Sequence, residues 1–156
     1  MKGVKKYLFL MAVVAALFGF VACSNDDDGA SKVAVYASDE ETLTFYDDGT
    51  FKVVEDGITV STGTYTGDVT KNTGVSNEVT ATIKKWRNED GKLVNIKDYV
   101  KAQVKKGLGS KADSVSEEYI DYLIETELKA LIDMPVTIQD GELTIHGLEE
   151  TYTKKN

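Results

Sequence analysis

The chain has 156 residues and a formal net charge of −8, so it is long enough to form one domain with a proper hydrophobic core. Its acidity argues against a nucleic-acid partner, because binding to phosphates needs a basic surface. Thirteen glycines, one proline and many Thr, Val and Tyr residues favour β structure with tight turns. The single cysteine excludes a disulfide within the chain.

The N-terminal segment has the charge and hydropathy pattern of a secretion signal. Three lysines in the first six residues precede an uncharged run from Tyr7 to Ala22. These 16 residues are fewer than the roughly 20 apolar residues that a membrane-spanning helix needs. The sequence therefore predicts a signal peptide over residues 1–22; a cleaved signal with an unrelated cysteine and an uncleaved anchor are the alternatives. Cleavage would remove the three lysines and change the net charge from −8 to −11.

The end of this segment, Phe20-Val21-Ala22-Cys23, resembles the signals of bacterial lipoproteins. The resemblance implies that Cys23 becomes the acylated first residue of the mature chain, with palmitate among its acyl groups. Several acyl chains would hold the protein at a membrane, since each buried CH₂ contributes about 0.8 kcal/mol. Residues 23–32 would then form a flexible tether. The implied location is the cell envelope, at the periplasmic face or outer surface of the outer membrane.

The clearest structural pattern in residues 33–156 is a β-hairpin around Asp47-Asp48-Gly49. A two-residue turn would place Phe45 opposite a lysine. A three-residue loop instead pairs Phe45 with Phe51 and Leu43 with Val53, which puts four apolar side chains on one face. We therefore expect the three-residue loop, with its glycine in the left-handed conformation.

Turn signals at Asp56-Gly57 and Asp140-Gly141 predict two more hairpins. A bulge at Gly63 would turn Tyr65 toward the inner face. Each two-residue turn fixes which side chains lie opposite each other. The expected pairs are Val53 with Val60, Glu55 with Ile58, Ile138 with Leu143, and Val136 with Ile145.

Alternating apolar residues indicate the remaining strands. Trp86 breaks the alternation of its strand, so it could line the opening of a ligand site or pack beneath the helices. The strands are expected at 33–36, 79–86, 93–94 and 151–153.

The apolar period changes to a helical one before the last hairpin, and two helices are expected at 97–106 and 116–132. Gly107 is expected to end the first helix. Ser114 is expected to cap the second through a Ser-x-x-Glu pattern. A basic stripe on the first helix could contact anionic lipid or an acidic partner, or could be a solvated face. The stripe consists of Lys97, Lys101 and Lys105.

Successive hairpins with one apolar face cannot remain a flat open sheet, because the apolar face must be covered and the edges closed. The sequence therefore predicts a mainly β fold with inserted helices. We expect an antiparallel meander that curls into a small barrel. The helical insert, 97–132, would come before the last hairpin and pack over one end or side of the barrel.

Several segments resemble the small lipocalin-like domains of bacterial lipoproteins. The resemblance implies a barrel that holds an apolar ligand or acts as an interaction module of the envelope, and it implies no catalytic residues. The segments are 43–51, 63–66 and 141–145, together with Tyr152 and Lys154.

No residue pattern indicates an enzyme, a cofactor or a metal. The single histidine, His146, alternates out of the inner face, and a zinc site needs about three to four nitrogen or sulfur ligands. Neighbouring carboxylates on a strand point to opposite faces, so adjacency alone does not make an acid–base pair. The aspartates at 26–28 lack the ligand spacing of a calcium loop. We therefore expect a protein that is not an enzyme.

Two functions fit these expectations: a structural or protein-interaction module, and a carrier of a small apolar ligand. The inward-facing side chains are large enough to fill a small barrel, which favours the first. The candidate ligand or packing residues are Trp86, Phe45, Phe51 and Tyr65, and the candidate interaction residues are Lys97, Lys101 and Lys105. The expected partners are the membrane, through the acyl chains, and an envelope protein or a small apolar ligand.

Overall fold

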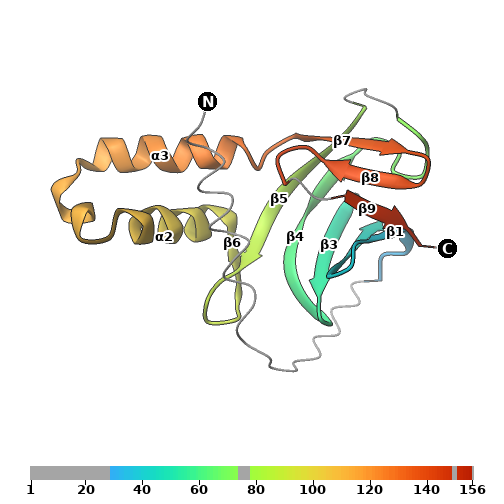
Figure 1. Cartoon of the computed structure of the whole chain (residues 1–156), viewed down its shortest axis with the longest axis horizontal. Coiled ribbons are helices and arrows are strands. Elements are labelled where there is room, and N and C mark those ends of the chain that lie inside the picture. The colour runs from blue at the N-terminus through green and yellow to red at the C-terminus, as the bar shows by residue number, and fades with distance from the viewer. Residues whose placement is uncertain (1–28, 74–77, 149–150, 156) are drawn as a thin grey trace.

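A computed structural model of the chain describes residues 29–73, 78–148 and 151–155 (Figure 1). They form one antiparallel sheet and two α-helices joined by a 3₁₀ turn. In chain order the elements are β1 (Lys32–Ala37), β2 (Glu41–Tyr46), β3 (Thr50–Glu55), β4 (Ile58–Thr66), β5 (Val79–Arg87), β6 (Leu93–Asn95), α2 (Ile96–Leu108), the 3₁₀ helix (Gly109–Ser114), α3 (Glu117–Lys129), β7 (Met134–Gln139), β8 (Glu142–Ile145) and β9 (Thr151–Lys154).

Eight of the strands close into an antiparallel barrel. Strands β1 to β5 pair in succession, and the ring continues through β7, β8 and β9 back to β1. Closure pairs every strand of the ring on both sides, so no long sheet edge is left open. The expected fold is therefore confirmed: a mainly β meander, closed into a barrel, with a helical pair inserted before the last hairpin.

The expected register of the first hairpin is confirmed. Phe45 lies opposite Phe51 and Leu43 lies opposite Val53. Gly49 has a φ of +81°, the left-handed conformation that its three-residue loop requires. The hairpin at Asp140-Gly141 also has its expected register, with Ile138 opposite Leu143 and Val136 opposite Ile145.

The expected register at the Asp56-Gly57 turn is only half right. Glu55 does lie opposite Ile58, but Val53 lies opposite Ser61 and not Val60. A bulge makes Val60 an additional residue in β4, and this moves every later residue of the strand by one position. Ser61 consequently occupies the inward position expected for Val60.

The two helices differ from expectation at their ends. Helix α2 continues past Gly107 to Leu108, and the residue at its C-terminal cap is Gly109, with a φ of +53°. Helix α3 is capped by Ser116, whose side chain accepts a hydrogen bond from the backbone N–H of Tyr119. Ser114 lies instead in the 3₁₀ helix that joins the two, which is why the expected capping box does not form.

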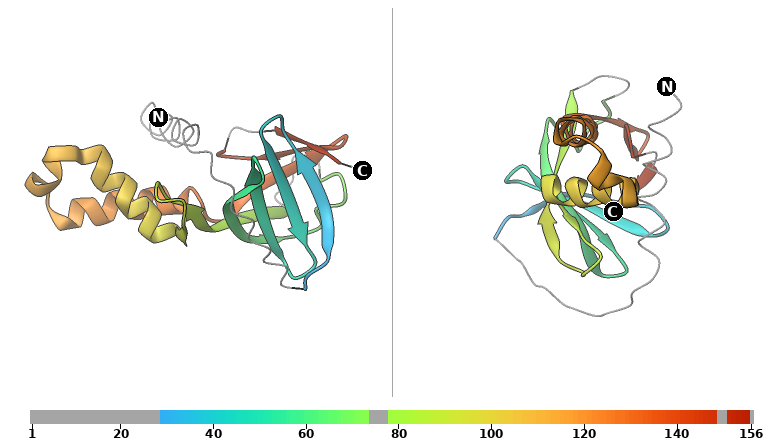
Figure 2. Two further views of the ribbon diagram at one scale, coloured as in Figure 1. Left: turned by 90° about the horizontal axis from the view of Figure 1, so that it is seen from below. Right: turned by 90° about the vertical axis from the view of Figure 1, so that its left-hand side faces the viewer.

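The helical pair leaves the barrel at β5, where this strand changes partner. Strand β7 pairs with β5 over Val79–Ala81, whereas β6 pairs with it over Lys85–Arg87. Helix α2 follows β6, and α3 returns the chain to β7. The pair therefore forms a hairpin that projects from the barrel along the long axis of the molecule (Figures 1 and 2).

Only the base of this helical hairpin contacts the barrel, which corrects the expectation that the pair packs over one end or side of it. The backbone N–H of Ile83 donates to the carbonyl of Leu131, just after α3. Val100 and Ile124 are buried where the two helices meet. The hairpin and the barrel therefore share one hydrophobic core near β5, and the rest of the hairpin stands clear of the strands (Figure 2).

Candidate functional site

The interior of the barrel is the first place where a ligand could bind, and apolar side chains fill it. Tyr36, Leu43 and Phe45 are 0% exposed, and so are Val136 and Leu143 on the opposite strands. A side chain beside a void large enough for a water molecule would retain exposed surface there. These five side chains therefore line no such void.

The candidate ligand-lining aromatic residues pack mainly against one another. Phe45 and Phe51 are buried, and their ring centres lie 5.9 Å apart. The half-buried ring of Tyr65 makes an edge-on contact with Phe45 at 4.9 Å. Its hydroxyl donates to the carbonyl of Tyr46 at 2.7 Å. Burial, together with the nearby carboxylates of Asp48, Asp47 and Asp68, raises the pKa of Tyr65. These rings are part of the packed core.

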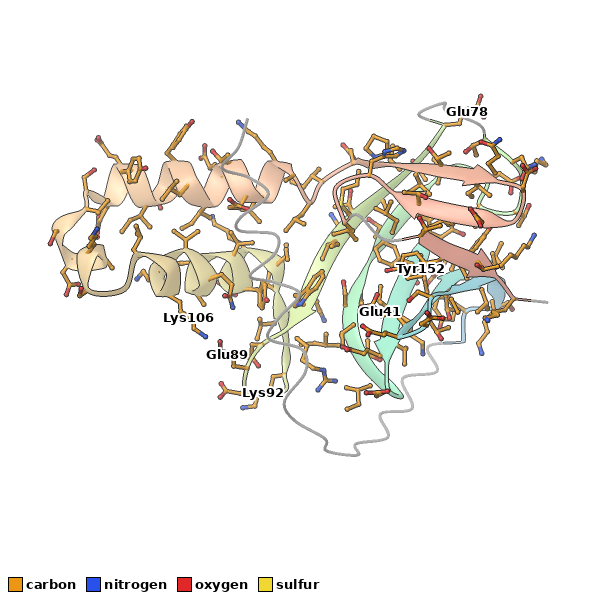
Figure 3. The ribbon with its side chains drawn as sticks, viewed as in Figure 1. Glu41, Glu78, Glu89, Lys92, Lys106 and Tyr152 are labelled. Atoms are coloured by element: carbon orange, nitrogen blue, oxygen red, sulfur yellow. The ribbon has the colours of Figure 1, made fainter. Side chains whose placement is uncertain are left out.

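Two buried tyrosines donate hydrogen bonds from the barrel interior to segments around it. The hydroxyl of Tyr36 donates to the carbonyl of Val69 at 2.7 Å, which fastens the loop after β4 against the barrel. Burial, and secondarily the charge of Asp68, raises the pKa of Tyr36. The hydroxyl of Tyr152 donates to Glu41 at 2.8 Å and links β9 to β2 (Figure 3). Both hydroxyls are therefore engaged within the protein.

Ser61 is a buried polar exception in this interior. It is 1% exposed, and its Oγ has no hydrogen-bond partner among the described residues. Ser61 lies opposite Trp86 and Val53 on the neighbouring strands. Its neighbours are thus largely apolar, and one unpaired hydroxyl does not make a binding site.

Trp86 lies at the junction of the barrel and the helical hairpin. Its ring stacks on that of Tyr99 in α2, with centres 5.9 Å apart and planes 30° apart. Burial raises the pKa of Tyr99, and the charge of Glu89 adds to the effect. Trp86 is half-buried in this contact. This contact is with α2, and both of the expected roles of Trp86 stay predictions.

The lysine stripe of α2 is fully displayed. Lys97, Lys101 and Lys105 are exposed and form no ion pair with any residue that the structure describes. The neighbouring Lys106 does form an ion pair, because its ammonium group points to Glu89 in the turn before β6 (Figure 3). The stripe is therefore available to a partner.

The outward face of α3 carries a feature that the sequence reading missed. Tyr119 is 50% exposed and Tyr122 is 64% exposed, and their rings stack with centres 6.4 Å apart. Both lie on the side of α3 away from the buried Ile124 and Leu131. The signal that could have revealed them is a pair of aromatic residues at i,i+3 outside the apolar stripe of the helix.

The titratable side chains discussed next, all among the described residues, make local hydrogen bonds and do not lie together as a catalytic group. His146 is exposed, and its Nε2 lies 2.7 Å from the hydroxyl of Thr137. Asp48 and Asp68 each accept hydrogen bonds from a threonine two residues later. The bonds from Thr50 lower the pKa of Asp48, whereas Asp68 has its pKa lowered chiefly by Lys71. Each of these contacts orders a turn or a strand.

Within residues 29–73, 78–148 and 151–155, no three His, Cys, Asp or Glu side chains are placed to hold a metal ion. In the same ranges, no helix has the length and apolar character required to cross a bilayer. Cys23 and the expected signal peptide lie outside the described residues.

Comparison with known proteins gave no match. Neither the known family models, nor the curated proteins, nor the solved structures include one that matches this chain.

Proposed function

We propose that the protein is a non-enzymatic interaction module of the cell envelope, which binds another protein through its helical hairpin. The observation that carries this proposal is a packed barrel from which a hairpin with exposed lysines and stacked tyrosines projects. Exposed tyrosines are common energetic centres of protein interfaces, since they bury a large area at little entropic cost. The barrel would serve as the rigid support of the hairpin.

The packed interior favours this function over the carriage of an apolar ligand. A ligand site of ordinary size has a volume of about 300–1,000 Å³ and is usually formed before the ligand binds. Leu43, Phe45 and Leu143 are completely buried by protein atoms. A ligand would therefore have to displace side chains that already contact one another.

A photoreactive residue at position 122 in intact cells tests the proposal. Tyr122 is 64% exposed, so the replacement does not disturb the core. We expect covalent adducts to form from position 122. The control carries the same photoreactive residue at Thr64, an exposed position of β4 on the barrel. Equal adducts from the two positions, or none from position 122, would contradict a role for the hairpin.

The proposal also includes attachment to a membrane through Cys23. It is supported by the uncharged run before this cysteine and by the acidic segment after it. Cells supplied with an alkyne-bearing fatty acid should incorporate it into the wild-type protein. Because Cys23 is the only cysteine of the chain, Cys23→Ala should abolish both the label and retention in the membrane fraction. A labelled Cys23→Ala protein would contradict lipidation at this residue.

A further inference from the structure

The two helices of the projecting hairpin carry opposite charges. Helix α2 contains four lysines and one aspartate, which give a net charge of +3. Helix α3 contains five acidic residues and one lysine, which give −4. The hairpin therefore has a basic helix and an acidic helix, although the whole chain is acidic.

The opposite charges do not neutralise each other within the hairpin. Among the described residues, no side chain of α2 forms an ion pair with one of α3. The separation of positive charge on α2 from negative charge on α3 has a local cause in part. Lys105 at the C-terminus of α2 and Glu117 at the N-terminus of α3 interact favourably with the helix dipoles. Lys97 and Lys101 lie in the first half of α2, where the helix dipole does not explain a positive charge. Their charges are therefore free to contact a partner outside the hairpin.

The outward face of α3 is complementary to a lysine stripe. Asp121 and Glu125 are exposed carboxylates on this helix, and Tyr119 and Tyr122 provide two exposed aromatic rings between and beside them. An ammonium group gains about 0.5–1 kcal/mol when it lies over an exposed aromatic ring. A row of lysines with one helical turn between successive charges fits such a face. The chain itself carries such a row on α2.

We propose that the helical hairpin binds a second copy of this chain, with the α2 stripe (Lys97, Lys101 and Lys105) of one copy on the α3 face (Glu118, Tyr119, Asp121, Tyr122 and Glu125) of the other. This inference rests on the proposed function, because it takes the hairpin as the binding element and names its partner. The projection of the hairpin makes the contact sterically possible, since two hairpins can lie side by side while their barrels remain apart (Figure 2).

The expected association is weak. Each helix has 13 residues, so the two hairpins can cover only a small interface compared with the roughly 1,600 Å² of a standard one. Tethering two copies to one membrane raises their effective concentration, which makes such weak contacts productive. Exposed charges also make the contact sensitive to salt.

Charge reversal in the full-length chain tests the proposal. In one variant, the three stripe lysines become glutamate: Lys97→Glu, Lys101→Glu and Lys105→Glu. In the other, three acidic residues of α3 become lysine: Glu118→Lys, Asp121→Lys and Glu125→Lys. Each variant is expressed in cells with two different affinity tags, and the recovery of the second tag with the first is measured after mild extraction.

Wild-type copies should co-purify at low ionic strength, and recovery should fall as salt increases. Each variant should lose self-association by at least about tenfold, because like charges then face each other. The two variants expressed together should associate with each other. The acidic α2 of one then faces the basic α3 of the other, and the basic α2 of the second faces the acidic α3 of the first. Recovery of the mixed pair also shows that the substitutions have not unfolded the hairpin.

Wild-type copies that do not co-purify at low salt would overturn the inference, as would variants that still self-associate or a mixed pair that stays apart. These failures are distinguishable from failure of the proposed function. If adducts from position 122 contain a different protein and no second copy, the hairpin is an interaction element but the partner is not this chain. If position 122 gives no adduct at all, both proposals fail.

Discussion

Ser61 shows how one residue reveals a compromise in the packing of the barrel. Its hydroxyl is buried without a partner among the described residues, and leaving such a group unpaired costs about 1–3 kcal/mol. It occupies an inward position because the bulge at Val60 shifts the strand by one residue. The position therefore favours a small apolar side chain over a polar one.

We expect Ser61→Ala to raise the free energy of unfolding by about 1 kcal/mol, because it removes the unpaired hydroxyl and leaves little space behind. Urea unfolding followed by tyrosine and tryptophan fluorescence measures the change. The matched control is Ser110→Ala, at an exposed serine in the 3₁₀ helix, which should change stability by less than about 0.5 kcal/mol. A destabilised Ser61→Ala protein would show that this hydroxyl has a partner in solution.

Glu127 is a second residue whose environment is unfavourable to its polar group. It is half-buried on α3, and burial raises its pKa above the usual value of 4.5. A pKa that is higher in the folded state contributes stability below the unfolded value, and this contribution is lost as the pH rises through the folded value. The charged carboxylate therefore destabilises the fold at neutral pH.

We expect Glu127→Gln to be more stable than the wild type at pH 7, by less than about 1 kcal/mol because solvent still screens a half-buried group. The difference should disappear when the pH falls below 4. Thermal unfolding at the two pH values measures it. Glu125→Gln removes the same charge from an exposed position of the same helix and serves as the control. A difference for Glu127→Gln that is unchanged at low pH would exclude titration of this carboxylate as the cause.

At the scale of elements, two glycines have opposite roles. Gly63 in β4 lies under the ring of Phe51, and a Cβ there would be 2.6 Å from Cζ of that ring and would overlap the carbonyl of Thr82. Gly107 lies in the last turn of α2 with open space around it. The first glycine permits close packing of a strand, and the second only weakens a helix.

Gly63→Ala should destabilise the protein by about 3 kcal/mol, because neither the strand backbone nor the packed ring can move freely. Gly107→Ala should instead stabilise it by about 0.5–1 kcal/mol, the ordinary difference between alanine and glycine in a helix. Denaturant unfolding of the pair measures both changes. Similar effects of the two substitutions would mean that Phe51 does not pack on Gly63.

At the scale of the whole molecule, the last strand closes the barrel. Strand β9 lies between β8 and β1, with Leu143 opposite Tyr152 and Tyr36 opposite Lys154. Its residue Tyr152 is 2% exposed. Four residues at the end of the chain therefore protect two strand edges and complete the core.

Removal of residues 151–156 should leave one edge of β1 and one edge of β8 unpaired, so we expect loss of cooperative unfolding and formation of soluble aggregates. Near-ultraviolet circular dichroism and size-exclusion chromatography measure these outcomes. A chain that lacks only residue 156 should behave as the wild type, because β9 and the bond from Lys155 to Val35 are retained. A monomeric, cooperatively folded truncation would show that closure by β9 is dispensable.

The sequence alone determined the features that arise from local geometry. The turns at Asp47-Asp48-Gly49 and Asp140-Gly141 constrain the backbone within a few residues, so the alternation of apolar side chains was enough to give their registers. The same alternation indicated a curled meander, since an apolar face must be covered. The lysine stripe was readable because helical spacing is also local.

Only the tertiary structure decided the features that depend on distant partners. The bulge at Val60 and the burial of Ser61 arise where β3, β4 and β5 meet, and no turn signal specifies them. The helical hairpin projects because β5 exchanges one partner strand for another, which leaves Tyr119 and Tyr122 uncovered. Local pattern indicates which residues share a face where no bulge shifts the strand, but what finally covers that face is decided by segments far away in the chain.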